Sequence, residues 1–330
     1  MVSTDPSPAP PIRTTSPAPD EIATFALADL SADPGWRRPV IVERELLILT
    51  TRRHGDAELD FHLLPCRPGT LLRVRAGQVL RCPGPQFDAT VVSFDPEALR
   101  GFDVDLDEPV TWRQLAGEDE DAVITEVSQL AVDCQRHPDG RTARALLRHQ
   151  LAVLLLRLAL ANPDRSTRRP EEETFRRFCR EVEHGYPHSR RVEDYAAELN
   201  CSVRTLTRAC LASTGRSAKQ VIDERVALQA ARLLAATDEP IAQIGRQLGF
   251  SEPTNFGRFF AREIGVSPGA FRAARDQPAA GRVVRPRPPA DPAGANGGRF
   301  RPTALAEPAN GGHTTRPGSP AGPAAGTSRA

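Results

Sequence analysis

The sequence predicts an α+β protein, with an antiparallel β-rich region first, a helical pair next and an all-helical region towards the C-terminus. Three observations predict this order. Apolar residues alternate in short runs from about residue 40 to residue 94, they recur at helical spacing from about residue 119, and helix-capping signals punctuate residues 171–275.

Turn-forming residues divide the β-rich region. Runs typical of strands cover residues 46–50, 58–63, 71–75, 78–80 and 89–94. Breakers such as Arg67-Pro68-Gly69 and Ala76-Gly77 separate them. Leu72 and Val74 alternate with arginines, which predicts one buried face and one wet or lumen-facing face. Short strands with closely spaced turns favour an antiparallel sandwich or barrel, which we assign to residues 21–112.

Two helices are expected within residues 113–162. The first carries apolar residues at helical spacing, namely Val123, Val127, Leu130 and Cys134. The second runs from Arg141 to Ala161 and carries a leucine stripe, namely Leu147, Leu151, Leu154 and Leu158, broadened by Leu155 and Leu156. The stripe fits either a helix packed against the sheet or a coiled-coil-like dimer seam, and it is too short for periodicity to decide.

Composition bounds the class of protein. A chain of 330 residues with 39% hydrophobic content is long enough for about two domains with real cores. Residues 1–20 and 276–330 are rich in Pro, Gly, Ala and Ser, which predicts disorder, and the polar run from Asn162 to Pro170 is interpreted as a linker.

Targeting and cysteine patterns predict a cytoplasmic protein. No run of about 18 apolar residues predicts a membrane span, and the start of the chain lacks the pattern of a secretory signal. The six cysteines are scattered without a CxxC pair, which suits reduced thiols rather than a disulfide framework.

Residues 191–213 show the first of two similar patterns. A short helix has an apolar face made by Val192, Tyr195, Ala196 and Leu199. Asn200-Cys201 forms a tight turn, and Ser202 caps a second helix in which Leu206 and Cys210 face inward. The outer face carries Arg204, Thr207, Arg208 and Leu211. This helix-turn-helix fits the DNA major groove, where arginine can bond to guanine O6 and N7.

The same arrangement returns about fifty residues later. Ile241, Ile244 and Leu248 face inward from a short helix, Gly249-Phe250 forms the turn, and Ser251 is expected to cap the next helix. Phe256 and Phe260 point inward from that helix, whereas the outer face carries Asn255, Arg258 and Arg262. Further caps are expected at Ser217, Asp238 and Ser267, with helix ends at Gly215, Gly249 and Gly265.

One long helix, residues 217–236, is expected between the two units. About 20 residues at about 1.5 Å each span about 30 Å, close to the roughly 34 Å of one DNA turn. Two reading helices could therefore enter successive segments of the major groove. The charge distribution adds a mild indication of a polyanionic partner, because residues 1–164 carry 17 Lys and Arg against 25 Asp and Glu, whereas residues 165–276 carry 19 against 15.

Residues 174–275 resemble the DNA-binding domain of the AraC family of transcription regulators. The resemblance rests on Pro-Ile-Ala-x-Ile-Gly-x-x-Leu-Gly-Phe-Ser-Glu at 240–252, Asn-Phe-Gly-Arg-Phe-Phe at 255–260 and Gly-Val-Ser-Pro-Gly-Ala-Phe-Arg at 265–272. It implies contacts to double-stranded DNA by Arg204, Thr207 and Arg208 in the first unit, and by Glu252, Pro253, Thr254, Asn255, Gly257 and Arg258 in the second. Pro253 and Gly257 offer no hydrogen-bonding side chain, so the second unit is expected to contact phosphates more than bases.

The N-terminal half resembles the cupin-like sensor of that family less closely. The segment from Arg67 to Val79 fits a cupin strand-turn-strand, but Leu80 stands where many cupins carry a histidine ligand. There is no His-x-His pair, and His54 and His62 are better explained as surface or packing residues than as ligands. We therefore expect no metal and no cofactor, and the resemblance implies a small-molecule effector of unknown identity.

The resulting hypothesis is a sequence-specific, effector-responsive transcription regulator rather than an enzyme. By resemblance it is more often an activator than a repressor, with RNA polymerase as its partner when it activates, and the leucine stripe leaves a homodimer open. Two alternatives are a ligand-independent DNA-binding protein and a cupin enzyme fused to a DNA-binding module. The second alternative needs a metal triad or a catalytic constellation, and the sequence shows neither.

Overall fold

The computed structural model describes residues 21–33, 35–83, 87–106, 111–137, 139–161 and 170–276, and all of them belong to one compact unit. The predictions of disorder at residues 1–20 and 277–330, and of a linker after Asn162, lie outside these residues. Asp276 itself closes the last described helix.

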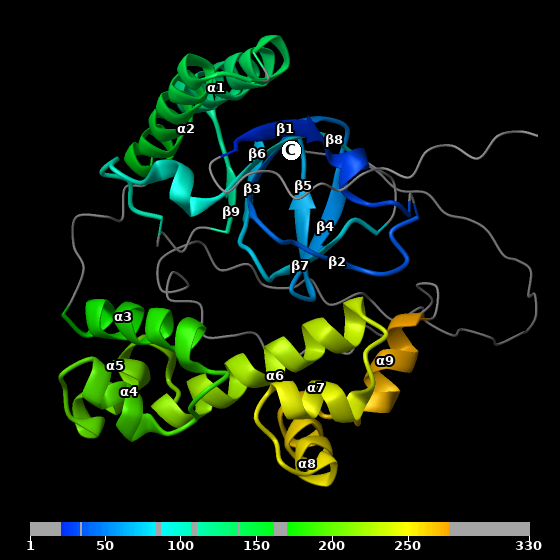
Figure 1. Cartoon of the computed structure of the whole chain (residues 1–330), viewed down its shortest axis with the longest axis vertical. Coiled ribbons are helices and arrows are strands. Elements are labelled where there is room, and N and C mark those ends of the chain that lie inside the picture. The colour runs from blue at the N-terminus through cyan, green and yellow to red at the C-terminus, as the bar shows by residue number, and fades with distance from the viewer. Residues whose placement is uncertain are drawn as a thin grey trace, which may run out of the picture. The chain divides into compact units, whose positions relative to one another are not determined.

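Two antiparallel sheets form the described N-terminal region (Figure 1). The five-stranded sheet has the order β1-β8-β3-β6-β9, with bounds Ala23–Ala26, Asp88–Phe94, Glu45–Arg52, Thr70–Val74 and Trp112–Gln114. The four-stranded sheet has the order β2-β7-β4-β5, with bounds Val40–Ile41, Val79–Arg81, Gly55–Leu59 and His62–Cys66. Two 3₁₀ helices, η1 (Leu27–Leu30) and η2 (Pro96–Leu99), follow β1 and β8.

The sheets enclose a common apolar core. Ile48, Leu72 and Val91 from the five-stranded sheet are fully buried in one cluster with Leu59 and Leu80 from the four-stranded sheet. Alternation along each strand sends every second side chain into this space. The predicted antiparallel barrel is therefore confirmed, with β1, β2 and β9 as strands that the sequence patterns did not indicate.

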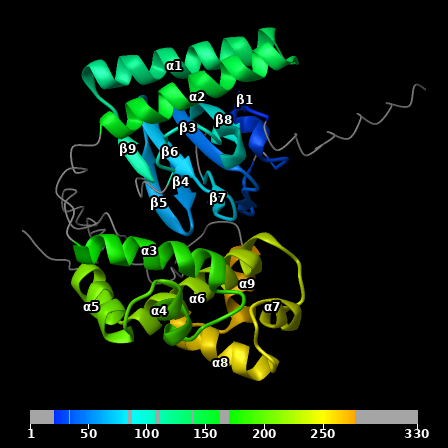
Figure 2. The same cartoon turned by 60° about the vertical axis from the view of Figure 1, so that its left-hand side comes forward.

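Helices α1 (Gly117–Arg136) and α2 (Arg141–Leu160) cover the other face of the five-stranded sheet (Figure 2). Leu47, Val92 and Phe94 point to this side and share a buried cluster with the helices. The expectation of a wet second face is therefore wrong for this sheet, because a helical layer covers it.

The leucine stripe of α2 belongs to the same buried cluster. Leu147, Leu151, Leu154 and Leu158 are all buried against α1 and the sheet, as is Leu155. The packing alternative therefore holds, and the dimer-seam alternative is wrong for these side chains, because a residue in the core of its own chain offers no surface to a second copy.

The strand predicted over residues 58–63 is a hairpin instead. β4 ends at Leu59 and β5 begins at His62, because Asp60 (φ 46°) and Phe61 (φ 69°) adopt left-handed backbone conformations. Neither residue is the glycine or asparagine that usually marks such a turn. Tertiary contacts hold the turn, since the Arg232 guanidinium donates to both Asp60 carboxylate oxygens at 2.8 and 2.7 Å, and the Phe61 ring meets Phe271 edge-on at 5.6 Å.

Residues 170–276 are helical, as predicted. The bounds are α3 Pro170–Gly185, α4 Val192–Glu198, α5 Val203–Thr214, α6 Ala218–Ala236, α7 Ile241–Gln247, α8 Pro253–Ile264 and α9 Pro268–Asp276. Two buried clusters divide them, and α6 contributes to both. Ala218, Val221 and Ile222 pack with α3, α4 and α5. The remainder of α6, from Val226 to Ala235, packs with α7, α8 and α9.

No helix in the described part of the chain is long and apolar enough to cross a bilayer. All six cysteines are free thiols. Burial raises the pKa of the Cys82, Cys179 and Cys210 thiols to about 12, so these groups are protonated at neutral pH.

Candidate nucleic-acid interface

The first helix-turn-helix unit consists of α4 and α5. Asn200 takes up a left-handed conformation (φ 52°) in the turn, which asparagine tolerates better than most residues. The Ser202 hydroxyl then accepts a hydrogen bond from the Thr205 backbone N–H at 3.0 Å and caps α5. Leu206 and Cys210 are fully buried, as the spacing predicted. The turn and the cap thus fix the angle at which α5 leaves α4.

The outer face of α5 carries the predicted contact residues. Arg204 and Arg208 are exposed, and Thr207 lies half-buried between them. The Arg208 side chain is 72% exposed, and its guanidinium lies 4.0 Å from a carboxylate oxygen of Glu171, in the first turn of α3. A screened contact at that distance leaves the guanidinium free to reach a base edge, but it places a competing anion beside it.

The second unit consists of α7 and α8. Gly249 (φ 77°) makes the turn, and Gly245 allows close packing, because a Cβ there would lie 3.1 Å from the Phe256 side chain. Phe256 and Phe260 are fully buried, as predicted. Phe250 in the turn packs against the Phe256 and Phe259 rings at 5.3 and 5.0 Å. An aromatic cluster therefore holds α8 against α7.

Two of the expected helix caps in this region are wrong. The residue before α8 is Glu252 rather than Ser251, and the residue before α7 is Pro240 rather than Asp238; neither makes a side-chain cap. Pro253 opens α8, where a missing N–H costs little, so the helix begins without a serine cap. The caps at Ser217 and Ser267 are confirmed.

The predicted contact residues of the second unit lie at the start of α8 and in its N-terminal half. Glu252, Thr254, Asn255 and Arg258 are all exposed, and Pro253 and Gly257 stand among them. Asn255 and Arg258 also line a cavity of about 450 Å³. The structure thus brings the predicted residues of each unit onto one helix face, as the spacing required.

Three charged residues of that cavity were not singled out by the sequence patterns, namely Arg190, Lys219 and Asp223. We call its five charged residues the cationic seam: Arg190, Lys219, Asp223, Arg258 and Arg262. Arg190 precedes α4, Lys219 and Asp223 lie in the first turns of α6, and the other two lie on α8. Because these residues come from three separate segments, only the folded chain brings them together.

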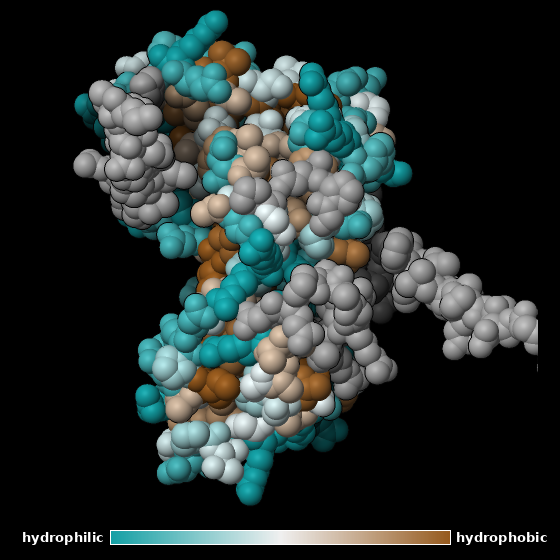
Figure 3. Space-filling view, turned by 90° about the vertical axis from the view of Figure 1, so that its right-hand side faces the viewer, coloured by the Kyte–Doolittle hydropathy of each residue, from teal (hydrophilic) through white to brown (hydrophobic). Residues whose placement is uncertain are grey.

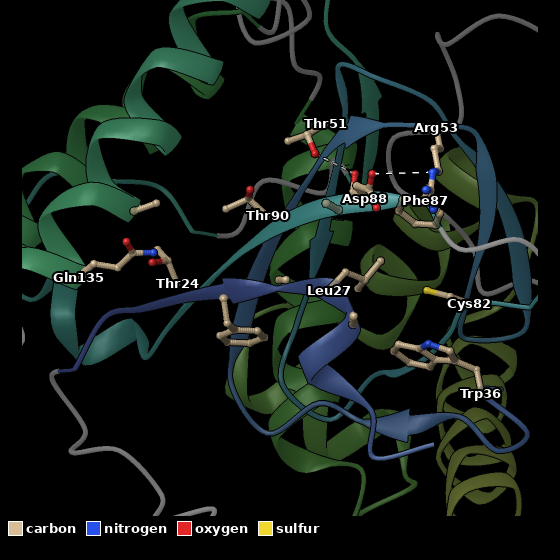
Figure 4. Close-up of a pocket in the computed structure, with 15 residues that line it drawn as sticks. Thr24, Leu27, Trp36, Thr51, Arg53, Cys82, Phe87, Asp88, Thr90 and Gln135 are labelled. Atoms are coloured by element: carbon tan, nitrogen blue, oxygen red, sulfur yellow. Dashed lines mark hydrogen bonds and ion pairs between the residues drawn. The ribbon is translucent and has the colours of Figure 1, made fainter. Parts of the chain in front are cut away.

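A second cavity, of about 470 Å³, lies at one end of the barrel beside β1 and β8 (Figure 4). Leu27, Trp36 and Cys82 form an apolar side, and Figure 4 shows Thr51, Arg53 and Asp88 at the opposite rim, with Phe87 beside Asp88. Arg53 Nε lies 4.0 Å from the Asp88 carboxylate. Among the described residues, no group of three or more His, Cys, Asp or Glu side chains has an arrangement that could hold a metal ion.

Comparison with known proteins agrees with the helical geometry. A family model described as a helix-turn-helix domain matches residues 195–274. The arabinose operon regulatory protein of Salmonella typhimurium is 26% identical over 249 residues, which cover 72% of this chain and 86% of that protein. The transcriptional activator RhaS of Klebsiella pneumoniae is 32% identical over 84 residues, covering 26% of this chain and 30% of RhaS.

Two solved structures are also similar. The chain aligns with ToxT of Vibrio cholerae O395 at 12% identity and a TM-score of 0.41, covering 77% of this chain and 96% of ToxT. It aligns with the DNA-binding domain of AdpA, solved in complex with a target DNA, at 32% identity and a TM-score of 0.28, covering 32% of this chain and 93% of that domain.

Two helix-turn-helix units that share α6, and the regulators to which their sequence is similar, define a DNA-binding transcription regulator. Its helix-turn-helix region is of the AraC type.

Proposed function

We propose that the protein regulates transcription by binding a specific DNA sequence in response to a small effector. The observation that carries this proposal is the pair of exposed outer faces on α5 and α8, on units joined by one shared helix. We propose residues 21–112 as the sensor, 113–162 as a helical association element and 171–275 as the DNA reader. The 19 residues of α6 span about 28 Å, which suits two successive major-groove segments.

The two units have different proposed roles. In the first, Arg204, Thr207 and Arg208 offer two forked donors and a hydroxyl, which suit the reading of base edges. In the second, Glu252, Thr254, Asn255 and Arg258 stand beside Pro253 and Gly257, so this unit supplies fewer donors to bases. We propose that contacts with the DNA backbone make up most of what the second unit contributes to DNA affinity.

Selection of bound sequences from a random DNA library by the full chain tests the proposal. We expect recovery of one preferred site, with Arg208→Ala losing the preference at one base position. Exposed Arg177 on α3 supplies a matched control, because Arg177→Ala removes the same charge from a helix that belongs to neither unit. Recovery of unselected sequence by the wild-type chain would instead favour a DNA-binding protein without site specificity.

The barrel cavity is the proposed effector site. Its volume of about 470 Å³ lies within the roughly 300–1,000 Å³ typical of small-molecule pockets. Leu27, Trp36 and Phe87 suit an apolar body, and the Arg53 rim suits a polar or anionic group. A compound screen by thermal shift should give a ligand that quenches Trp36 fluorescence, and Ala89→Trp, which fills the cavity, should abolish both effects. If none of these ligands changes DNA binding by the chain, the result would favour the ligand-independent DNA-binding protein.

The exposed side of α2 is the proposed surface for a homodimer. Leu146, Val153, Leu156 and Leu160 are exposed at spacings of seven, three and four, beside the buried stripe. Figure 3 shows the hydrophobic surface of one face broken into separate patches among hydrophilic atoms. Since this spacing is that of a coiled-coil seam, a second copy of α2 is the occupant we propose. Val153→Glu with Leu156→Glu should halve the mass seen by light scattering and leave the melting temperature unchanged, whereas a wild-type monomer would contradict the proposal.

Activation is the proposed direction of control, with RNA polymerase as the partner. RhaS, which is 32% identical to this chain over 84 residues, is named as a transcriptional activator. We propose further that the chain acts in the cytoplasm and is not an enzyme. A reporter with the selected site upstream of a weak promoter tests activation, and a fall in expression on adding the protein would indicate a repressor.

A further inference from the structure

We propose that the cationic seam binds a backbone phosphate of the DNA, at the point where the strand passes between the two major-groove segments. The proposal rests on DNA binding by the tandem units. It assigns a site to Arg190 and Lys219, which lie outside both outer faces, together with Arg262 in the last turn of α8. Its ligand is a phosphodiester, recognised by charge and not by sequence.

The seam has four cationic side chains and one carboxylate. Asp223 is only 8% exposed and lies between two of the cations. The Lys219 ammonium group donates to one of its oxygens, and a guanidinium nitrogen of Arg262 lies 3.5 Å from the other. Glu263, outside the cavity lining, also accepts from Arg262 at 2.7 Å. Two carboxylates still leave the four cations with an excess of positive charge.

Asp223 also fixes the direction of the charges beside it. It belongs to α6, whereas Arg262 belongs to α8, so the shared contact ties the reading helix to the central helix. The Lys219 and Arg262 side chains nevertheless remain 51% and 63% exposed. Both side chains are held in place and are still open to an anion. Because they are already ordered, they lose less conformational entropy when they bind a phosphate.

Arg190 contributes a partly desolvated charge. Its guanidinium lies 3.6 Å from the centre of the Phe250 ring and donates to the Leu248 carbonyl oxygen. Burial lowers the pKa of Arg190, although arginine stays charged at any physiological pH. Its closest described contacts are a ring face and a carbonyl oxygen, and the Asp223 carboxylate, which Lys219 and Arg262 also share, offsets its charge only in part. An anion that enters the cavity meets this charge in a setting where water screens it less.

The place of the seam between the units identifies the ligand. Arg190 directly precedes the first unit, Arg262 lies on the second, and Lys219 stands at the start of the helix that joins them. When two reading helices occupy successive major-groove segments, the phosphates that border the intervening minor groove face the join between the units. A phosphodiester oxygen is therefore the anion that this position presents to the seam.

Binding titrations on the selected site test the inference. Lys219→Gln and Arg262→Gln should each weaken binding to all sequences about equally and lower the salt slope by about one unit. The ratio of wild-type to variant affinity should then shrink about threefold between about 50 mM and about 200 mM salt. Arg177→Gln is the control and should leave the slope unchanged. An unchanged slope in both seam variants would overturn the proposal.

Neutral methylphosphonate linkages identify the phosphate itself. Replacing single phosphates between the two half-sites should weaken the wild-type chain at one or two positions, and Lys219→Gln should lose nothing further there. Equal losses in the wild type and the variant would place the contact elsewhere. The two failures are distinguishable: a wild-type chain that selects no site contradicts the proposed function, whereas a chain that selects one but shows no coupling at the seam contradicts only this inference.

Discussion

The two helix-turn-helix units share a motif but differ in what supports them. The first unit packs on α3, and its best-placed arginine, Arg208, stands beside a surface carboxylate. The second unit packs with α9 on the part of α6 that also receives the tip of the β4–β5 hairpin. Buried charge pairs and aromatic contacts surround it. The first unit therefore presents its side chains on a lightly supported helix pair, whereas contacts with the barrel and α9 hold the second unit in a fixed position.

The hairpin contact contains two buried ion pairs. Arg232 binds Asp60 through two nitrogens, and these side chains are only 6% and 8% exposed. Glu58 accepts from Arg275 at 2.6 Å and also pairs with Arg81. The Arg275 guanidinium lies 4.5 Å from the centre of the Phe61 ring. These groups join β4 and the hairpin turn to α6 and α9.

The largest expected effect is the loss of one buried partner. Asp60→Ala should lower the free energy of unfolding by about 3–5 kcal/mol, because Arg232 would remain buried without a counter-charge. Asp238→Ala is the control, since Asp238 is 81% exposed and pairs with Arg38 at 2.6 Å. That pair should contribute less than about 1 kcal/mol. Denaturant titration measures both, and equal small losses would show that the hairpin does not anchor the second unit.

The next effect separates the units by their contacts with DNA. Arg208→Ala should cost about 1–3 kcal/mol of binding and relax the preference at one base position, if its guanidinium binds a guanine edge. Arg258→Ala should weaken all sequences alike and lower the salt slope by about one unit. Titrations on the selected site and its single-base variants, with melting temperature as the control, measure both. A sharp drop in melting temperature for Arg258→Ala would instead assign that residue a structural role.

Glu58, in the contact that supports the second unit, should make stability depend on pH. Burial alone would raise the pKa of Glu58, but Arg275 and Arg81 outweigh it and hold the pKa below its usual range. A depressed pKa gives stability that is present above the unfolded-state value and is lost as the pH falls. Unfolding of the wild type should therefore become easier as the pH drops below about 4–5, where unfolded glutamate titrates.

Glu58→Gln provides the matched measurement, because it keeps the size of the side chain and removes its titration. The variant should be less stable than the wild type at neutral pH and should show a flatter dependence on acid. Parallel pH profiles for the two chains would mean that Glu58 makes no such contribution.

The sequence predicted the helical half, apart from the caps expected at Asp238 and Ser251, because local signals and tertiary packing agree there. Ser202, Ser217 and the glycines at 215, 249 and 265 each mark a helix boundary that the structure shows. The hairpin turn at Asp60-Phe61 could not be predicted, since its left-handed conformations are held by Arg232 and Phe271, which follow about 170 or more residues later. The grouping of residues in the cationic seam was missed for the same reason, because no spacing along the chain relates Arg190 to Arg262.

The leucine stripe shows a different limit. Periodicity correctly predicted that Leu147, Leu151, Leu154 and Leu158 lie on one face of a helix. It could not say whether the sheet or a second chain covers that face, because both partners are equally apolar. The sequence also could not show that Val153 and Leu156 form a separate, exposed face, because apolar residues occupy most positions of α2.

The smallest expected effect concerns the carboxylate beside the first unit. Glu171→Gln should raise affinity for DNA about two- to fivefold, because the Glu171 carboxylate would repel a phosphate and compete with DNA for Arg208. The gain should stay below about 1 kcal/mol, since the contact is exposed and 4.0 Å long. The same change should lower stability slightly, since Glu171 lies in the first turn of α3, where a negative charge favours the helix. Affinity and stability thus move in opposite directions, which a purely structural role would not produce.

Glu173→Gln is the control for this prediction. It removes the same charge two residues away, where Glu173 pairs with Arg176 at 3.4 Å, and should leave affinity almost unchanged. Equal gains from both variants would indicate a general charge effect rather than release of Arg208, and the reading role of the first unit would then have to rest on Arg204 and Thr207.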